Sequence, residues 1–193
     1  MNVSDKISKQ ESNFVKTKDF TKRSQWYQLK EMIEQGLVTK VKRGVYYYGA
    51  NEMLDQTVEI SKVVSSGVFC LFTAWRYYSL STQNPVEFHI AVTQKKKVNL
   101  PENLPVKIYY WSEMQYSLGV SEKEIERQKI KIYNLEKSVC DAVKFRNKIG
   151  LDTTIEVLKN YVKRHDKNLN KLSRYAAQMR VENILQTMIM PLL

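Results

Sequence analysis

Basic and amide side chains gather in two short stretches near the N-terminus, at positions 22–30 and 40–43. Lysine and arginine side chains bind the phosphates of nucleic acids, and glutamine side chains hydrogen-bond to base edges in the grooves. We therefore expect Gln25 and Gln28 to read bases and the lysines and arginines of these stretches to anchor the phosphate backbone. The expected DNA contacts are Lys22, Arg23, Gln25, Gln28, Lys30, Lys40, Lys42 and Arg43.

Residues that could support catalysis or bind a metal do not form a recognisable set in the sequence. Glu136 and Asp141 are five residues apart on an expected helix, so they do not form a close carboxylate pair. His89 lies within an expected strand and His165 at the end of an expected helix, and neither has a partner at metal-ligand spacing. We therefore expect no catalytic site, no metal and no cofactor.

Cysteine use and apolar content predict where the chain resides. Cys70 and Cys140 lie in apolar surroundings at no redox or metal spacing, which indicates reduced core residues. Apolar stretches such as Val63–Ala74 fall short of the roughly 20 residues that cross a bilayer. The polar first twelve residues lack the apolar core of a signal peptide. These features predict a cytoplasmic protein with no membrane span.

The net charge of +11 is typical of nucleic-acid-binding proteins. Residues 1–50 hold ten basic and five acidic side chains, a net charge of +5, so nearly half of the excess falls in the first quarter of the chain. Late in the sequence a second basic surface is expected from Lys163, Arg164, Lys167, Lys171 and Arg174.

The basic stretches near the N-terminus coincide with a helix followed by a hairpin. Trp26, Leu29, Met32 and Ile33 have helical spacing, and Gly36 can end that helix in a left-handed conformation. Two β-prone runs, 37–42 and 45–48, then flank Arg43-Gly44. A helix, a glycine and a basic hairpin predict a winged helix-turn-helix domain over residues 1–50, with a short first helix at 5–11 and a connector at 14–20.

Residues 51–193 are expected to form a mixed α/β domain with a small sheet and C-terminal helices, so the predicted fold class is α+β. A helix is expected from about 54 to 64, and strands at 86–93, 106–110 and 129–133. The remaining chain is helical: Asn134 can cap a helix over 135–145, and Thr153 and Glu156 match a capping box. Two more helices are expected at 170–179 and 181–190.

Two stretches of the sequence resemble the AbiEi family, the antitoxins of type IV abortive-infection toxin–antitoxin systems. The first runs from Leu29 to Val38 and continues through Arg43-Gly44-Val45-Tyr46, similar to that family's recognition helix and wing. The second, Tyr133 to Asp141, is similar to its "vEKtlcDl" stretch. It is followed in the expected order by Ile149-Gly150 and the helix around Tyr175-Ala176-Ala177.

This resemblance implies a repressor that binds inverted repeats in the double-stranded DNA of its own operator. It also implies that the chain counteracts a nucleotidyltransferase-type toxin without forming a stable complex with it. The short N-terminal region departs from the family pattern, because it leaves little room for a separate second helix before Thr21.

Two alternatives remain open at the level of the sequence. The chain could be a ligand-responsive winged-helix regulator whose pocket is formed by Phe69, Phe72, Trp75, Tyr77 and Tyr78. It could instead be a restriction-endonuclease-like protein, which needs an acidic residue and an acid-x-Lys motif on adjacent strands to hold Mg²⁺. Glu87 opens an expected strand, but no acid-x-Lys follows on the next one.

Overall fold

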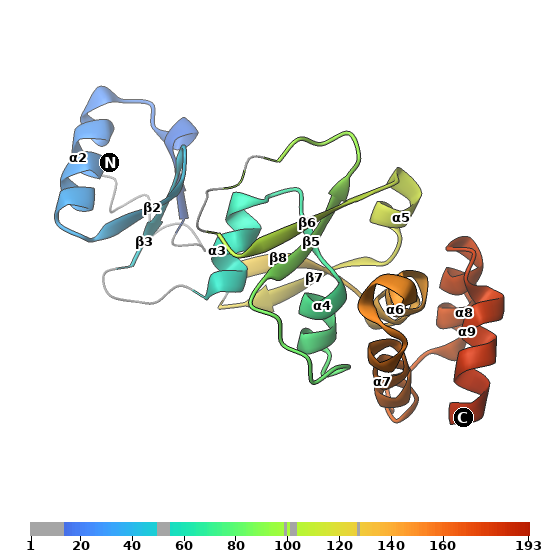
Figure 1. Ribbon diagram of the computed structural model, residues 1–193. Coiled ribbons are helices and arrows are strands. Elements are labelled where there is room, and N and C mark those ends of the chain that lie inside the picture. Colours follow the sequence, from blue (N-terminus) through green and yellow to red (C-terminus); the bar gives the residue numbers. More distant parts are fainter. Residues whose placement is uncertain (1–13, 50–54, 99, 101–103, 127) are drawn as a thin grey trace. The chain divides into compact units, whose positions relative to one another are not determined.

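The chain has a mixed α+β fold in two compact units, as seen in a computed structural model that describes residues 14–49, 55–98, 100, 104–126 and 128–193 (Figure 1). The first unit comprises the described residues up to Ser65 together with 124–130, and the second comprises 66–123 and 131–193. The α+β class expected from the sequence is confirmed. The helix expected at 5–11 and the domain boundary expected at residue 50 lie outside the described residues.

The first unit is a three-stranded sheet with a helix packed on each face. Its elements are β1 (Phe14–Lys16), the 3-10 helix η1 (Thr17–Asp19), α2 (Arg23–Glu34), β2 (Val38–Lys42), β3 (Val45–Tyr48) and α3 (Gln56–Val63). The strand order is β1-β3-β2, with antiparallel pairing throughout. The helix and hairpin expected from the sequence are therefore present as α2 and β2–β3. Helix α3 belongs to the same unit.

Strand β1 replaces the connector that the sequence predicted at 14–20. Successive strand residues point to opposite faces of a sheet, and both faces are buried here. Phe14 packs with Val45, Tyr47 and Val58 of α3, whereas Val15 packs with Met32 of α2. A strand of three residues is enough to hold β1 in place, because the adjacent side chains of Phe14 and Val15 enter different apolar clusters.

Two glycines end α2 and turn the hairpin as the sequence predicted. Gly36 has φ +72°, and the N–H of Leu37 donates to the carbonyl of Met32 over 2.9 Å, a hydrogen bond typical of a left-handed helix end. Gly44 has φ +80° in the two-residue turn between β2 and β3, a conformation that costs glycine little.

A second sheet, mixed and five-stranded, has the order β6-β5-β4-β8-β7 and belongs mostly to the second unit; residues 124–125 of β7 and 128–130 of β8 belong to the first unit. Its strands are β4 (Val68–Phe69), β5 (Phe88–Thr93), β6 (Val106–Trp111), β7 (Val120–Ile125) and β8 (Gln128–Tyr133). Strand β4 pairs antiparallel with β5 and parallel with β8, and β5 pairs parallel with β6. The sequence predicted β5, β6 and β8. It did not indicate β7, an edge strand whose interior is Ser-Glu-Lys-Glu.

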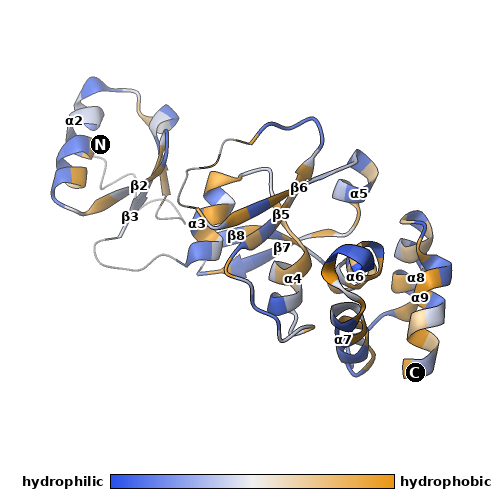
Figure 2. Ribbon diagram, viewed as in Figure 1, coloured by the Kyte–Doolittle hydropathy of each residue, from blue (hydrophilic) through white to orange (hydrophobic). Residues whose placement is uncertain are grey.

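Helices of the second unit pack around a large apolar cluster. They are α4 (Leu71–Tyr77), α5 (Glu113–Ser117), α6 (Leu135–Ile149), α7 (Leu151–Val162), α8 (Leu169–Gln178), α9 (Glu182–Ile189) and the 3-10 helix η2 (Met190–Leu192). Helices α6 to α9 each carry hydrophobic and hydrophilic residues (Figure 2), and their hydrophobic residues contribute to the cluster. In the described part of the chain, no helix has the length and apolar character needed to cross a membrane.

The caps of α6 and α7 differ in how well the sequence predicted them. Asn134 caps α6 as expected, because its side-chain oxygen accepts from the N–H of Lys137 over 3.1 Å. The capping box expected at Thr153 and Glu156 is wrong: α7 already begins at Leu151. The Glu156 carboxylate instead accepts hydrogen bonds from the N–H of Thr82 and the hydroxyl of Ser81, both at 2.7 Å.

Candidate nucleic-acid interface

The solvent-facing side of α2 presents a short basic and aromatic row. Arg23, Tyr27 and Lys30 are spaced by four and three residues, so they share one side of the helix, and all three are exposed. The guanidinium of Arg23 donates to the Tyr27 hydroxyl over 3.3 Å and lies 5.8 Å from the centre of the Tyr27 ring. This row lies within the first two turns of α2.

Tyr27 was not among the residues predicted from the sequence. Its side chain is 60% exposed, the most exposed large hydrophobic residue of α2. Its position four residues after Arg23 and three before Lys30 was a signal for it. Only charged and amide side chains were predicted as contacts, so this aromatic ring, which can stack or hydrogen-bond, was missed.

Gln25 was predicted to read bases, and this prediction is wrong. Its side chain is only 4% exposed. Its Oε1 accepts from the backbone N–H groups of Thr21 and Lys22 at 3.1 and 3.2 Å, which satisfies donors at the start of α2 that have no partner within the helix. The buried residues of α2 are Gln25 and Leu29, whereas Trp26 and Ile33, which helical spacing placed on the same side as Leu29, are 44% and 37% exposed.

The remaining candidates on and before α2 differ in exposure. Lys22 is exposed just before the helix, whereas Gln28 is half-buried. Toward the C-terminal end of α2 the exposed residues include Glu31 and Glu34, whose charge repels phosphate. The basic part of α2 therefore ends at Lys30.

The hairpin places its three predicted phosphate contacts in different environments. Lys40 and Arg43 are exposed, with Arg43 in the turn itself. Lys42 is half-buried, and its ammonium donates to the carbonyl of Val63 at the end of α3 over 3.1 Å. Burial, followed by the charge of Lys16, lowers the pKa of Lys42. Lys42 therefore also joins the hairpin to α3.

Three of the five cations predicted to form a second basic surface on the late helices have partners within the chain. Lys163 and Arg174 are exposed, but the other three cations are engaged in internal contacts. Arg164 bonds to Asp166 and to the carbonyl of Tyr78, Lys167 donates to the carbonyl of Arg164, and Lys171 lies 2.8 Å from Glu136. These bonds hold the α7–α8 connection and the start of α6 in place.

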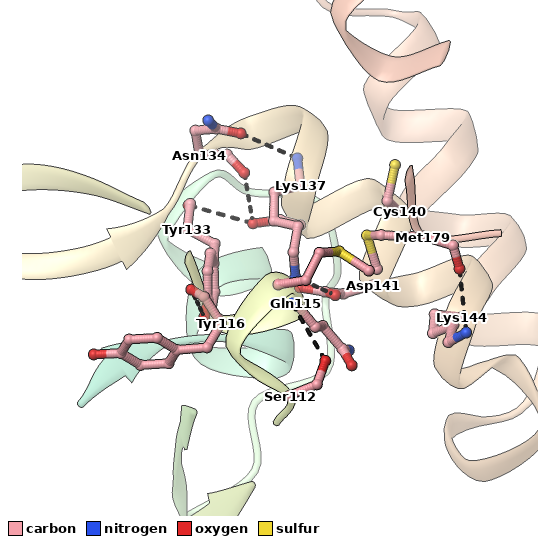
Figure 3. Close-up of polar contacts among 12 residues, drawn as sticks. Ser112, Gln115, Tyr116, Tyr133, Asn134, Lys137, Cys140, Asp141, Lys144 and Met179 are labelled. Atoms are coloured by element: carbon pink, nitrogen blue, oxygen red, sulfur yellow. Dashed lines mark hydrogen bonds and ion pairs between the residues drawn. The ribbon is translucent and has the colours of Figure 1, made fainter. Parts of the chain in front are cut away.

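Two of the three acidic residues considered for catalysis, Glu136 and Asp141, have a basic partner. Glu136 pairs with Lys171, and Asp141 pairs with Lys137 over 2.6 Å in the interior (Figure 3). Glu87 is exposed just before β5. Within the described residues, histidine, cysteine and acidic side chains do not cluster in threes that could hold a metal ion.

His89, Cys70 and Cys140 of the second unit are buried, and burial shifts the pKa of each toward its uncharged form. Burial, followed by the charge of Lys107, lowers the pKa of His89 to about 4, and the Tyr109 hydroxyl lies 3.0 Å from its Nδ1. Burial also raises the pKa of the Cys70 and Cys140 thiols, which keeps both protonated near neutral pH.

The five aromatics considered as a ligand pocket are split between the interior and the surface. Phe69 and Trp75 are buried, and the indole N–H of Trp75 donates to the carbonyl of Ser138 over 2.9 Å. Tyr77 is 42% exposed. Core packing thus accounts for the innermost members of this group.

Comparison with known proteins supports the fold. No family model matches the sequence, and no curated protein matches it. Among solved structures, the chain is similar to the crystal structure of the RV2827C protein from Mycobacterium tuberculosis, with a TM-score of 0.63 at 10% sequence identity. The similarity covers 97% of this chain and 79% of that one, so it extends over nearly the whole fold.

Proposed function

We propose that the first unit binds duplex DNA, with α2 in the major groove and the β2–β3 turn against the phosphate backbone. The observation that carries this proposal is the exposed row of Arg23, Tyr27 and Lys30 on the first turns of α2. In helix-turn-helix proteins, the N-terminal residues of the recognition helix contact base edges. The exposed Arg43 in the turn adds a cation suited to a phosphate.

The order of elements supports a winged form of this module. Strand β1 pairs with the hairpin, η1 follows it, α2 comes next, and β2 and β3 close the sheet. We interpret η1 as a one-turn substitute for the helix that precedes the recognition helix in a complete helix-turn-helix. In this interpretation β2 and β3 are the wing.

Fluorescence anisotropy with the full chain and labelled duplex DNA, over a series of salt concentrations, tests the proposal. Each lost phosphate contact should lower the slope of log affinity against log salt by about 0.9. We expect Arg43→Gln to lower the slope by this amount and Arg23→Gln to weaken binding. Lys107→Gln, an exposed lysine of β6 in the second unit, is the matched control. Equal binding by all four proteins would refute the proposal.

We further propose that the chain is an antitoxin that represses its own operon. This step rests on the resemblance of residues 29–46 and 133–141 to the AbiEi family. The second of these stretches forms the start of α6, which contains the buried Lys137–Asp141 pair. The target would be a nucleotidyltransferase-type toxin encoded beside this chain, opposed without a stable complex.

Co-expression with the adjacent gene separates the two activities. We expect the full chain to restore growth and to repress its promoter. A variant with Arg23→Gln and Arg43→Gln should lose repression and keep the rescue of growth, because both changes lie on exposed groups of the first unit. A harmless adjacent gene would contradict the antitoxin proposal and leave DNA binding to be judged by the anisotropy measurement.

A further inference from the structure

A basic cleft of about 620 Å³ lies within the first unit, beside the turn of the hairpin. Five cationic side chains line it: Lys16, Lys18, Lys42, Arg43 and Lys62. None of the described residues that line it is acidic. Only Lys42 and Arg43 were considered as phosphate contacts from the sequence, so three of these cations are new to the site.

The five cations come from four elements in three separate stretches of the sequence. Lys16 ends β1, Lys18 lies in η1, Lys42 and Arg43 end β2 and begin the turn, and Lys62 lies in α3. Backbone and side-chain hydrogen bonds fix these elements together. The N–H of Thr17 donates to the carbonyl of Gly44 over 3.0 Å, and Lys42 donates to Val63 over 3.1 Å. The cleft is therefore part of the folded unit.

None of the five cations in this cleft forms a salt bridge with an acidic side chain of the described residues, so their positive charge is not neutralised by these residues. Burial, followed by the charge of Lys16, lowers the pKa of both Lys42 and Lys62. The Lys62 ammonium lies 4.8 Å from the centre of the Phe14 ring. This cation–π contact offsets only part of the cost of burying the ammonium. A bound anion would relieve the repulsion between these cations. If the cations had a purely structural role, acidic side chains would be expected among them.

We propose that this cleft is a phosphate-binding site that takes either a backbone phosphate of DNA or the phosphates of a small compound. A phosphate group offers several acceptor oxygens to ammonium and guanidinium donors. The volume is within the range of small-molecule sites, about 300–1,000 Å³. The DNA source rests on the proposed function, whereas the small-molecule source does not depend on it.

Calorimetric titration of the full chain with inorganic tripolyphosphate tests the site. A charge-assisted hydrogen bond contributes about 1.5–3 kcal/mol, so Lys16→Gln and Lys62→Gln should each raise Kd about tenfold or more. Glutamine keeps most of the side-chain stem, and circular dichroism verifies that each variant is folded. Lys107→Gln, at an exposed lysine of the second unit outside the cleft, should stay within about twofold of wild type. Unchanged tripolyphosphate binding in both cleft variants would overturn the proposal.

DNA binding by the same variants identifies the source of the phosphate. If the cleft holds a backbone phosphate, Lys62→Gln lowers the salt slope by about 0.9 and tripolyphosphate competes with DNA. If it holds a small compound, Lys62→Gln raises the Kd for tripolyphosphate about tenfold or more and leaves DNA affinity unchanged. Both results support a phosphate site. Tripolyphosphate binding that depends on Lys62, in a protein that does not bind DNA, would refute the DNA proposal alone.

Discussion

The ammonium nitrogen of Lys137 lies 2.6 Å from a carboxylate oxygen of Asp141, one turn further along α6, and both side chains are fully buried. The same ammonium is 4.3 Å from the ring centre of Trp111 and 4.2 Å from that of Tyr133. An isolated buried charge is strongly unfavourable, and each member of this pair reduces that cost for the other. The two residues therefore form a single energetic unit.

Removing one member of this pair should destabilise the protein more than removing both. Lys137→Met leaves the Asp141 carboxylate unpaired in the interior, so we expect a loss of about 3–5 kcal/mol in the free energy of unfolding. Adding Asp141→Leu should restore a large part of the loss. Urea denaturation of the single and double variants measures the difference. A double variant at least as unstable as Lys137→Met would show that the two charges do not depend on each other.

The close approach of Gly119 to Lys137 predicts a second effect on stability. Gly119 has φ +73°, and a Cβ added there would lie 2.6 Å from the Lys137 Cβ. Gly36 has nearly the same φ, +72°, with open space around its added Cβ. Gly36→Ala should cost about 1–2 kcal/mol for the left-handed backbone alone, and Gly119→Ala about 1–3 kcal/mol more for the overlap. Denaturation curves showing equal losses would exclude a steric role for Lys137.

Burial of His89 predicts a pH-dependent contribution to stability. Its pKa falls to about 4 in the folded chain, first because of burial and then because of Lys107, from 6.5 in the unfolded chain. As the pH falls, the unfolded state therefore binds a proton at His89 before the folded state does. The contribution of neutral His89 is present above pH 6.5 and is lost as the pH falls toward 4.

The loss at low pH should be on the order of 3 kcal/mol. We expect the difference in unfolding free energy between wild type and His89→Gln to shrink by up to this amount between pH 7 and pH 4. Urea denaturation at pH 7, 5.5 and 4 measures this difference. A difference that stays constant across the range would contradict the shifted pKa of His89.

Gln25 and Tyr27 should have opposite roles in the first unit. Gln25→Ala removes the acceptor for Thr21 and Lys22, so it should destabilise the unit by about 1 kcal/mol and leave DNA sequence preference unchanged. Tyr27→Ala alters an exposed side chain, so it should weaken DNA binding and leave stability nearly unchanged. Denaturation and competition binding against altered duplexes distinguish the two. If Gln25→Ala lost its DNA sequence preference, Gln25 would have to contact bases, contrary to this prediction.

Local patterns in the sequence determined the elements on which the candidate site is built. The spacing of Leu29 and Met32 predicted α2, and Gly36 predicted its end, because helix periodicity and the left-handed conformation of glycine are local properties. The Arg43-Gly44 turn followed from the same kind of evidence. Strands β5, β6 and β8 were also predicted, since each carries a run of β-branched or aromatic residues.

Tertiary structure decided which faces and charges these elements present. Periodicity indicated an apolar side of α2, but Gln25, whose side chain bonds to the backbone, lies on the buried side, and Trp26 and Ile33 are exposed. The basic cleft joins residues as distant as Lys16 and Lys62, and the sheet pairing that brings their strands and helices together is long-range. Side-chain direction follows from local backbone geometry, whereas burial and the sum of charges depend on every segment that packs nearby.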